Sequence, residues 1–197
     1  MQKFSLNNIK SFKCSEEIEI KPITVFVGKN SSGKSSLIRF PVVLAQTFRD
    51  EAITPLLLFG NMIDYGNFDD VIYKHYSEEI GFKLVFGREL EHFIRADRDF
   101  RLLISIANRN CYIYNSKVEI RVYISKQERK IKVKRTELYF DEEKICTVCL
   151  EDKEFYKIMF HKLYNGCEWI EREIDFTGEK VHFNKFIPAI DAKELPV

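Results

Sequence analysis

One short segment of this sequence has glycines, a lysine and hydroxyl side chains at a spacing that binds phosphate. It matches the pattern G-x-x-x-x-G-K-[ST] at every fixed position, namely Gly28, Gly33, Lys34 and Ser35. Glycines let successive backbone N–H groups curl around an anion, and a helix that follows points its positive end toward that anion. In such a loop Lys34 reaches the β- and γ-phosphates of a nucleotide, and the Ser35 hydroxyl binds Mg²⁺. The spacing therefore predicts a nucleotide phosphate site.

The residues around the loop support this interpretation. Residues 23–27 are apolar and predict a short strand, and residues 35–49 predict a helix, so the loop lies between strand and helix as the pattern requires. The alternative is a turn that caps a helix and binds nothing, but a complete match in this context disfavours it. Lys34 is the candidate catalytic residue because it would stabilise charge on a transferred phosphoryl group. The candidate cofactor-binding residues are Gly28, Lys29, Asn30, Ser31, Ser32, Gly33, Lys34, Ser35 and Ser36.

The first third of the chain predicts an α/β arrangement around this loop. Pro41 lies inside the predicted helix and removes a backbone donor, so we expect a kink near Phe40 or a break there. The other expected elements are strands at residues 3–12 and 16–21, the second ended by Pro22, and a short helix or buried turn at residues 52–63 that closes at Gly60.

From about residue 79 apolar and polar residues alternate, which is the strand period. In residues 117–125 the even-numbered positions are apolar and the odd-numbered ones polar, which indicates an antiparallel meander with one face in water. A helix is expected at residues 152–166, and a closing hairpin at residues 169–186 that turns at Thr177 and Gly178. The predicted strands of the meander are residues 80–87, 100–107, 117–125, 129–140 and 144–150.

Length and composition limit the class of protein. A chain of 197 residues can form one domain or one lobe of a larger domain. Its 45% hydrophobic and 31% charged residues are typical of a soluble globular protein, and a net charge of +1 gives no global attraction to nucleic acid or membrane. No run approaches the roughly 18 apolar residues of a membrane-spanning helix, and the first residues do not resemble a secretory signal. We therefore expect a cytoplasmic protein with no membrane partner.

Five cysteines at uneven spacing do not indicate a disulfide framework. Cys146 and Cys149 form a C-x-x-C, which would be half of a zinc site if Cys167, His161 or His182 joined it. The residues around them predict a strand, in which positions three apart point to opposite faces. Buried strand cysteines are therefore the expected structure.

Residues 28–37, GKNSSGKSSL, resemble the phosphate loop of the ABC/SMC class of ATPases, in which asparagine is common at the position of Asn30. Residues 4–38 look like the start of bacterial AAA-labelled ATPases of the OLD-like type, which open with two strands before the loop strand. Residues 61–75, NMIDYGNFDDVIYKH, resemble the segment of those proteins between the loop helix and the antiparallel sheet. The resemblance covers roughly residues 1–90 well and the later meander only in general character.

The resemblance implies an α/β fold with an antiparallel β meander, as in the N-terminal lobe of an ABC/SMC-type ATPase head. Residues 1–78 would form its P-loop α/β core segment, residues 79–150 the meander of the same head, and residues 151–197 a helix plus a hairpin. The turn at residues 10–12 would lie near the adenine or the phosphates, unless it is a polar strand end with Phe12 in the core. ATP and Mg²⁺ are the implied cofactors, held by Gly28, Asn30, Gly33, Lys34, Ser35 and Ser36.

ATPases of this class hydrolyse ATP only with a strand that ends in Asp-Glu and a serine-glycine signature from a second subunit. The chain has no such signature. Asp141 and Glu142 follow three apolar residues and are the alternative catalytic pair, but the alternating segments on both sides predict a solvated hairpin turn. The chain would then be the N-terminal lobe of a longer ATPase, or half of a split one, with exposed apolar surface and an unpaired strand edge.

The first functional hypothesis is an ATP-driven switch. Two heads, as a homodimer or with a split partner, would close around ATP and control a partner or a nuclease effector. The resemblance implies a place in DNA processing or in antiviral defence against phage. The alternative is a nucleic-acid-binding module that uses the basic strand at residues 126–135, with nucleotide as a secondary ligand.

That basic strand has two interpretations. Lys130, Lys132 and Lys134 alternate with apolar residues and would form a stripe on one face, suited to a phosphate backbone, or they form only the solvated face of an edge strand. A kinase or GTPase built on the same loop is a third possibility, although the chain has no N-K-x-D segment for guanine.

Overall fold

The computed structural model describes residues 1–75, 78–87, 117–127, 130–152, 155–164, 169–179 and 181–189, with only the backbone at residues 162–164, 169–179 and 189. The helices are α1 (Lys34–Arg49), α2 (Phe68–Val71) and the 3₁₀ helix η1 (Tyr73–His75). The strands are β1 (Lys3–Ile9), β2 (Phe12–Cys14), β3 (Ile18–Glu19), β4 (Glu79–Phe86), β5 (Val118–Gln127), β6 (Lys130–Phe140), β7 (Glu143–Asp152), β8 (Phe155–Tyr164), β9 (Trp169–Glu179), β10 (His182–Asn184) and β11 (Ile187–Ala189).

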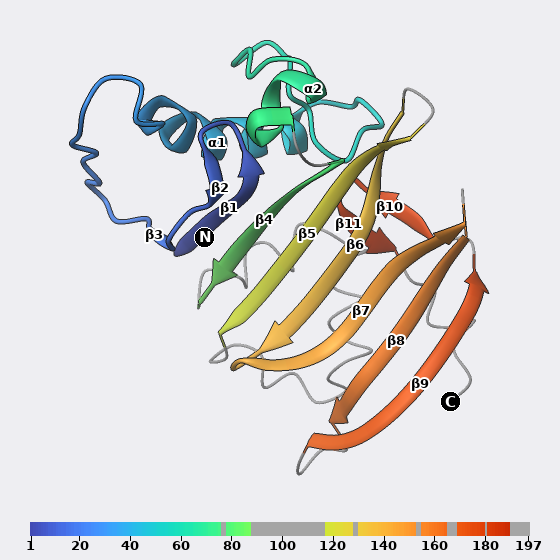
Figure 1. Ribbon diagram of the computed structural model, residues 1–197. Coiled ribbons are helices and arrows are strands. Elements are labelled where there is room, and N and C mark those ends of the chain that lie inside the picture. The colour runs from blue at the N-terminus through green and yellow to red at the C-terminus, as the bar shows by residue number, and fades with distance from the viewer. Residues whose placement is uncertain are drawn as a thin grey trace.

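One large antiparallel sheet dominates the described part of the chain (Figure 1). Its nine strands run in the order β2-β1-β4-β5-β6-β7-β8-β9, with β3 also paired to β1. β10 and β11 form a separate two-stranded hairpin. The predicted α/β class with an antiparallel meander is confirmed, and strands from all three predicted segments lie in the same sheet.

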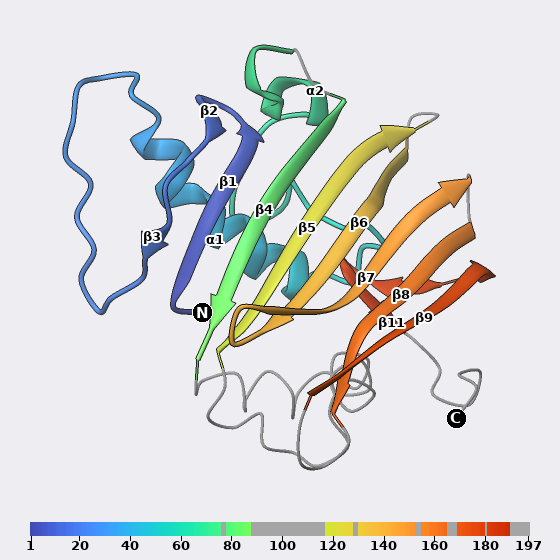
Figure 2. The ribbon, with the colours of Figure 1, turned by 60° about the horizontal axis from the view of Figure 1, so that its bottom comes forward.

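Helix α1 packs across one face of the sheet, behind β1 and β4 (Figure 2). The contact is made by packed aromatic rings, of which Phe4 and Phe40 are stacked and the others are tilted or edge-to-face. The Phe40 ring lies 5.7 Å from Phe4 on β1 and 5.3 Å from Phe82 on β4, measured between ring centroids. Phe186, between β10 and β11, extends the row by packing 5.1 Å from Phe82 and 5.2 Å from Phe48. These contacts hold the helix that follows the phosphate loop against the meander.

Helix α1 runs unbroken through Pro41, so the break allowed by the sequence does not occur. Proline inside a helix costs about 3 kcal/mol. Phe40, Val43 and Leu44 are all buried on the sheet side of α1, and each such burial stabilises by roughly 1.5–3 kcal/mol. Packing against the sheet therefore outweighs the lost backbone hydrogen bond.

Residues 52–63 form no helix, and they are buried only at Leu56 and Leu58, so the alternative of a buried turn holds only in part. The polar side chains of α1 bind their backbone. The buried Gln46 amide donates to the Leu57 carbonyl at 2.6 Å and accepts from the Ile63 N–H at 3.0 Å. The Leu57 N–H donates to the Thr47 hydroxyl at 2.9 Å. These bonds satisfy backbone groups that a helix would otherwise satisfy itself.

Residues 155–164 form strand β8, so the helix predicted at residues 152–166 is wrong. Tyr156, Ile158 and Phe160 are buried and alternate with less buried residues, which is the strand period. Apolar residues in this segment fit the helical period almost as well. Pairing along the edge of β7 decides between the two, because it satisfies backbone groups of both strands.

Strand β9 continues through Thr177 and Gly178, so the turn predicted there is also wrong. Its register with β8 shifts between Tyr156 and Ile158, where β9 has one residue more than β8. The pair therefore belongs to a β-bulge, where glycine is also common.

The strand predicted at residues 100–107 lies outside the described residues. Among the helices described, none is both long and apolar enough to cross a membrane.

Candidate phosphate site

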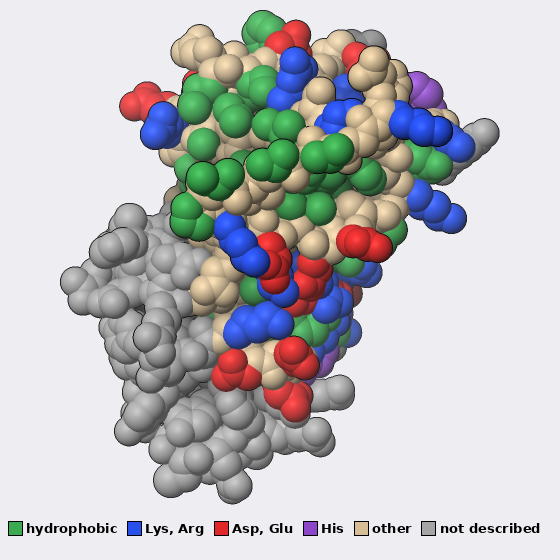
Figure 3. Space-filling model, turned by 90° about the vertical axis from the view of Figure 1, so that its left-hand side faces the viewer, with side chains coloured by type: hydrophobic (Ala, Val, Ile, Leu, Met, Phe, Trp, Pro, Cys, Tyr) green, Lys and Arg blue, Asp and Glu red, His purple; other side chains and the backbone are tan. Residues whose placement is uncertain are grey.

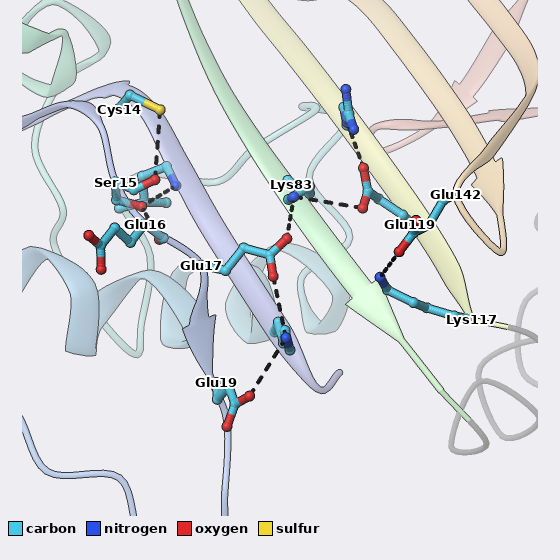
Figure 4. Close-up of polar contacts among 12 residues, drawn as sticks. Cys14, Ser15, Glu16, Glu17, Glu19, Lys83, Lys117, Glu119 and Glu142 are labelled. Atoms are coloured by element: carbon cyan, nitrogen blue, oxygen red, sulfur yellow. Dashed lines mark hydrogen bonds and ion pairs between the residues drawn. The ribbon is translucent and has the colours of Figure 1, made fainter.

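The chain that leads into the loop is anchored on the sheet face opposite α1 (Figure 4). The Glu17 carboxylate pairs with Lys83 on β4 and lies 3.4 Å from the ammonium of Lys3 on β1. Lys83 also lies 3.7 Å from the carboxylate of Glu119 on β5. The hydrogen bond from Lys83, followed by the charge of both lysines, lowers the pKa of Glu17. The start of the loop segment is thereby held against the meander.

Residues 23–27 do not form the predicted strand. β2 and β3 occupy the free side of β1, and no strand in the described ranges pairs with residues 23–27. Ile23, Val25 and Val27 are 83%, 75% and 90% exposed, while Phe26 packs against the core. Figure 3 shows hydrophobic side chains gathered on this side of the molecule. The strand does not form because a strand needs a neighbouring backbone for its hydrogen bonds. The apolar side chains that remain exposed are typical of an interaction surface.

The loop brings the chain sharply into the start of α1. Ser31 and Gly33 have positive φ angles of 62° and 90°. The Gly33 carbonyl accepts hydrogen bonds from the N–H groups of Ser36 at 2.9 Å and Leu37 at 3.2 Å. Helix α1 begins directly afterwards at Lys34 and has no side-chain cap. Since the first N–H groups of a helix have no acceptor within it, the positive end of α1 faces the loop.

The Lys34 ammonium lies within the curve of the loop. It donates to the carbonyl of Gly28 at 2.7 Å and to the carbonyl of Lys29 at 2.5 Å, and lies 3.5 Å from the Ser32 hydroxyl. A full positive charge and the uncapped helix end are therefore close together. This combination suits a phosphate group, which accepts charge-assisted hydrogen bonds from both.

The hydroxyl-bearing residues Ser31, Ser32 and Ser35 are exposed, and the Ser32 hydroxyl lies next to the Lys34 ammonium. The residues present therefore fit a nucleotide phosphate chain. Among the described residues no group of three or more His, Cys, Asp or Glu side chains could hold a metal ion. Mg²⁺ in nucleotide sites takes few protein ligands and keeps phosphate and water oxygens, so Ser35 can supply the protein ligand that the loop pattern predicts.

The turn at residues 10–12 forms one wall of the loop. A Cβ atom on Gly33 would lie 2.6 Å from Cζ of Phe12 and 3.1 Å from Cβ of Ser11. Phe12 also packs against the hydrophobic core. The two interpretations of this turn are therefore compatible, because Phe12 belongs to the core edge and still contacts the loop. Only glycine fits the position of Gly33, for its φ angle and for this contact.

Asp141 and Glu142 form the exposed turn between β6 and β7, as the hairpin interpretation predicted. Asp141 accepts a hydrogen bond from the Lys117 N–H at 2.8 Å, and Glu142 lies 3.4 Å from the Lys117 ammonium. The strand register aligns this turn with the start of β1, whereas Gly33 packs near Phe12, which pairs with Ile9 at the end of β1. The six steps of roughly 3.3 Å between the first and last residues of β1 separate the two by about 20 Å along the strand direction, and the turn also lies three strands away from β1. The structure therefore does not bring this carboxylate pair to Lys34.

The predicted basic stripe is interrupted by a bulge in β6. Arg135 pairs with Tyr123, but Val133 pairs with the next residue of β5, so Lys134 is the extra residue. Lys134 lies 2.9 Å from the Glu79 carboxylate, and Lys126 lies 2.5 Å from the Asp69 carboxylate. Only Lys130 and Lys132 keep the expected alternation. The described structure thus offers a shorter and partly neutralised stripe, and we propose no function for it.

The cysteine pair has the strand geometry predicted for it. Cys146 pairs with Leu138 and is buried, whereas Cys149 pairs with Arg135 and is half-buried. Their separation of three puts them on opposite faces of β7. Burial raises the pKa of the Cys146 thiol to about 12. The two cysteines are therefore structural residues of strand β7, and Cys146 belongs to the hydrophobic core.

One residue that touches the start of α1 was missed from the sequence. Tyr65 is buried, and its hydroxyl donates to the Ser36 carbonyl at 3.0 Å. Residues 61–75 resemble a segment of OLD-like ATPases, but that resemblance assigns no role to a particular side chain. A tyrosine between glycine and polar residues gives no periodic signal, because its contact depends on the path of the chain.

No family model, curated protein or solved structure matches this chain. The phosphate site is consequently defined by its own residues and their arrangement.

Proposed function

We propose that this chain binds ATP with Mg²⁺ through residues 28–36 and serves as the nucleotide-binding part of an ABC/SMC-type ATPase head. The observation that carries the proposal is the position of Lys34, whose ammonium lies inside the loop next to the uncapped end of α1. Exposed hydroxyls at Ser31, Ser32 and Ser35 complete the same surface. The complete loop pattern supports nucleotide binding, and the resemblance at Asn30 supports the ATPase class.

Each group has a defined part in this proposal. Lys34 exchanges its bonds to loop carbonyls for bonds to phosphate oxygens, and backbone N–H groups at the start of α1 bind the same phosphates. Ser35 provides a hydroxyl ligand to Mg²⁺, and the ion neutralises charge on the β- and γ-phosphates. Positioning and charge stabilisation of this kind supply only part of phosphoryl transfer, because a group must also orient the attacking water.

We further propose that this missing group comes from a partner element that covers residues 23–27. Ile23, Val25 and Val27 expose apolar side chains directly before the loop, and a partner strand with an Asp-Glu end would bury them beside the phosphates. Closure of two such heads around ATP would then control a partner or an effector in DNA processing or phage defence.

Phosphate release from Mg-ATP tests the need for a partner. We expect the isolated chain to bind Mg-ATP without releasing phosphate above background. The reason is that Asp141 and Glu142, in the β6–β7 turn, are aligned with the start of β1, whereas the phosphate loop lies near its end. The assay compares wild type, Lys34→Ala, and Asp141→Asn combined with Glu142→Gln. Phosphate release by the wild type that is abolished in Lys34→Ala would contradict the need for a partner. If phosphate release were also abolished in the double variant, the β6–β7 turn would be catalytic.

A further inference from the structure

Tyr65 links the segment after α1 to the first turn of α1. Its side chain is 4% exposed, and its hydroxyl donates to the Ser36 carbonyl at 3.0 Å. Its own N–H donates to the Leu58 carbonyl at 2.8 Å, which fixes the backbone from which the side chain extends. Ser36 is the third residue of α1 and follows the two residues that carry the phosphate chemistry. A displacement of Tyr65 would therefore shift the backbone of α1 within one turn of Lys34.

The same segment also holds the turn that contacts Gly33. The Lys10 N–H donates to the Val71 carbonyl at 2.5 Å, and the Lys10 ammonium donates to the Asp70 carbonyl at 3.2 Å. That ammonium lies 5.4 Å from the centroid of the Tyr65 ring, within range of a cation–π contact. Residues 65–71 thus touch the start of α1 directly through Tyr65 and touch the loop indirectly through the turn at residues 10–12.

We propose that Tyr65 is a positioning residue for the phosphate loop, an inference that rests on the proposed function. The Tyr65 hydroxyl fixes the first turn of α1 from one side, while Phe12 contacts Gly33 from another. Phosphate binding depends on the direction of the N–H groups at this turn and on the reach of Lys34. Supporting contacts of this kind set whether such groups lie in the productive arrangement.

Tyr156 provides a matched control. It is 6% exposed, and its hydroxyl donates to a backbone carbonyl, that of Val133, at 2.9 Å. Tyr65→Phe and Tyr156→Phe therefore each remove one buried hydroxyl and leave one carbonyl without that donor. Because the two losses are alike, a purely structural role predicts the same shift in the urea midpoint for both variants and unchanged nucleotide affinity.

The test measures Mg-ATP and pyrophosphate affinities by calorimetry for wild type and both variants. We expect Tyr65→Phe to weaken both ligands by about tenfold, because the phosphate contacts are displaced, and Tyr156→Phe to leave both unchanged. Equal affinities for wild type and Tyr65→Phe would overturn the inference while leaving the proposed function intact. A wild type that binds neither ligand would overturn the proposed function.

Hydrogen exchange gives a second readout that needs no nucleotide. Tyr65→Phe is expected to speed amide exchange at residues 37–40 of α1, and Tyr156→Phe is expected to leave those amides unchanged. The same protection in wild type and Tyr65→Phe would show that the hydroxyl does not position the helix start, whatever the ligand affinities. Both measurements can be made on folded protein, since Tyr65→Phe keeps the buried ring.

Discussion

Replacement of Gly33 by alanine is expected to weaken Mg-ATP binding severely while the antiparallel sheet stays folded. The φ angle of 90° at Gly33 costs a residue with a side chain about 1–3 kcal/mol. The added Cβ would also lie 2.6 Å from Cζ and 2.7 Å from Cε2 of Phe12. Phe12 is partly buried and packs against the core, so moving its ring away would expose apolar surface. The loop must shift instead, and the N–H groups at the start of α1 lose their alignment.

Gly66→Ala is a control that has the backbone strain of a positive φ angle without the contact that a Cβ on Gly33 would make with Phe12. Gly66 has a similar φ angle of 101°, but a Cβ there would meet the flexible end of Lys10 at 3.2 Å. We expect Gly33→Ala to weaken Mg-ATP binding by about 100-fold or more, and Gly66→Ala, which lies next to Tyr65, to weaken it by no more than the roughly tenfold expected for Tyr65→Phe. Calorimetry and circular dichroism of both variants check this. Near wild-type affinity in a folded Gly33→Ala protein would refute the loop geometry.

Replacement of Ile23, Val25 and Val27 by threonine together is expected to suppress self-association of the isolated chain. Threonine keeps strand propensity but lowers the apolar surface. Burial of each wild-type side chain would stabilise a contact by roughly 1.5–3 kcal/mol, so we expect the association constant to fall by at least about 100-fold. Sedimentation velocity over a range of protein concentrations measures this change.

A second set of exposed apolar residues controls for general hydrophobicity. Ile53 and Phe59 are 102% and 71% exposed and lie on the turn held by α1. If residues 23–27 are the partner surface, Ile53→Thr with Phe59→Thr leaves association largely unchanged. An equal effect from both sets would contradict a specific partner surface at residues 23–27. A wild-type chain that stays monomeric at high concentration would contradict self-association through these residues.

Local chemistry made the loop and most of the meander predictable. The fixed residues of the loop and the alternation in residues 117–125 have a direct physical meaning, and the structure contains the corresponding helix start and strands. Residues 155–164 were misassigned because their apolar residues fit two periods, and only pairing with β7 distinguishes them. Thr177 and Gly178 suit a turn or a bulge equally well, so their assignment depended on the register of β9.

The strand predicted at residues 23–27 failed for a different reason. Its residues favour a strand, but strand formation depends on a neighbouring backbone, which the described residues do not provide. Tyr65 was missed because its role comes from one hydrogen bond to Ser36, far away in sequence. In both cases the deciding contact is tertiary, and no local pattern encodes it.

Calorimetric titration with Mg-ATP, on wild type and Lys34→Ala side by side, tests nucleotide binding by the loop most directly. Lys34→Ala removes the charge that lies inside the loop, together with its bonds to the Gly28 and Lys29 carbonyls. We predict saturable one-to-one binding by wild type and a loss of about 10- to 100-fold in affinity for the variant. The same affinity in both proteins, or no binding by a folded wild type, would contradict the proposal.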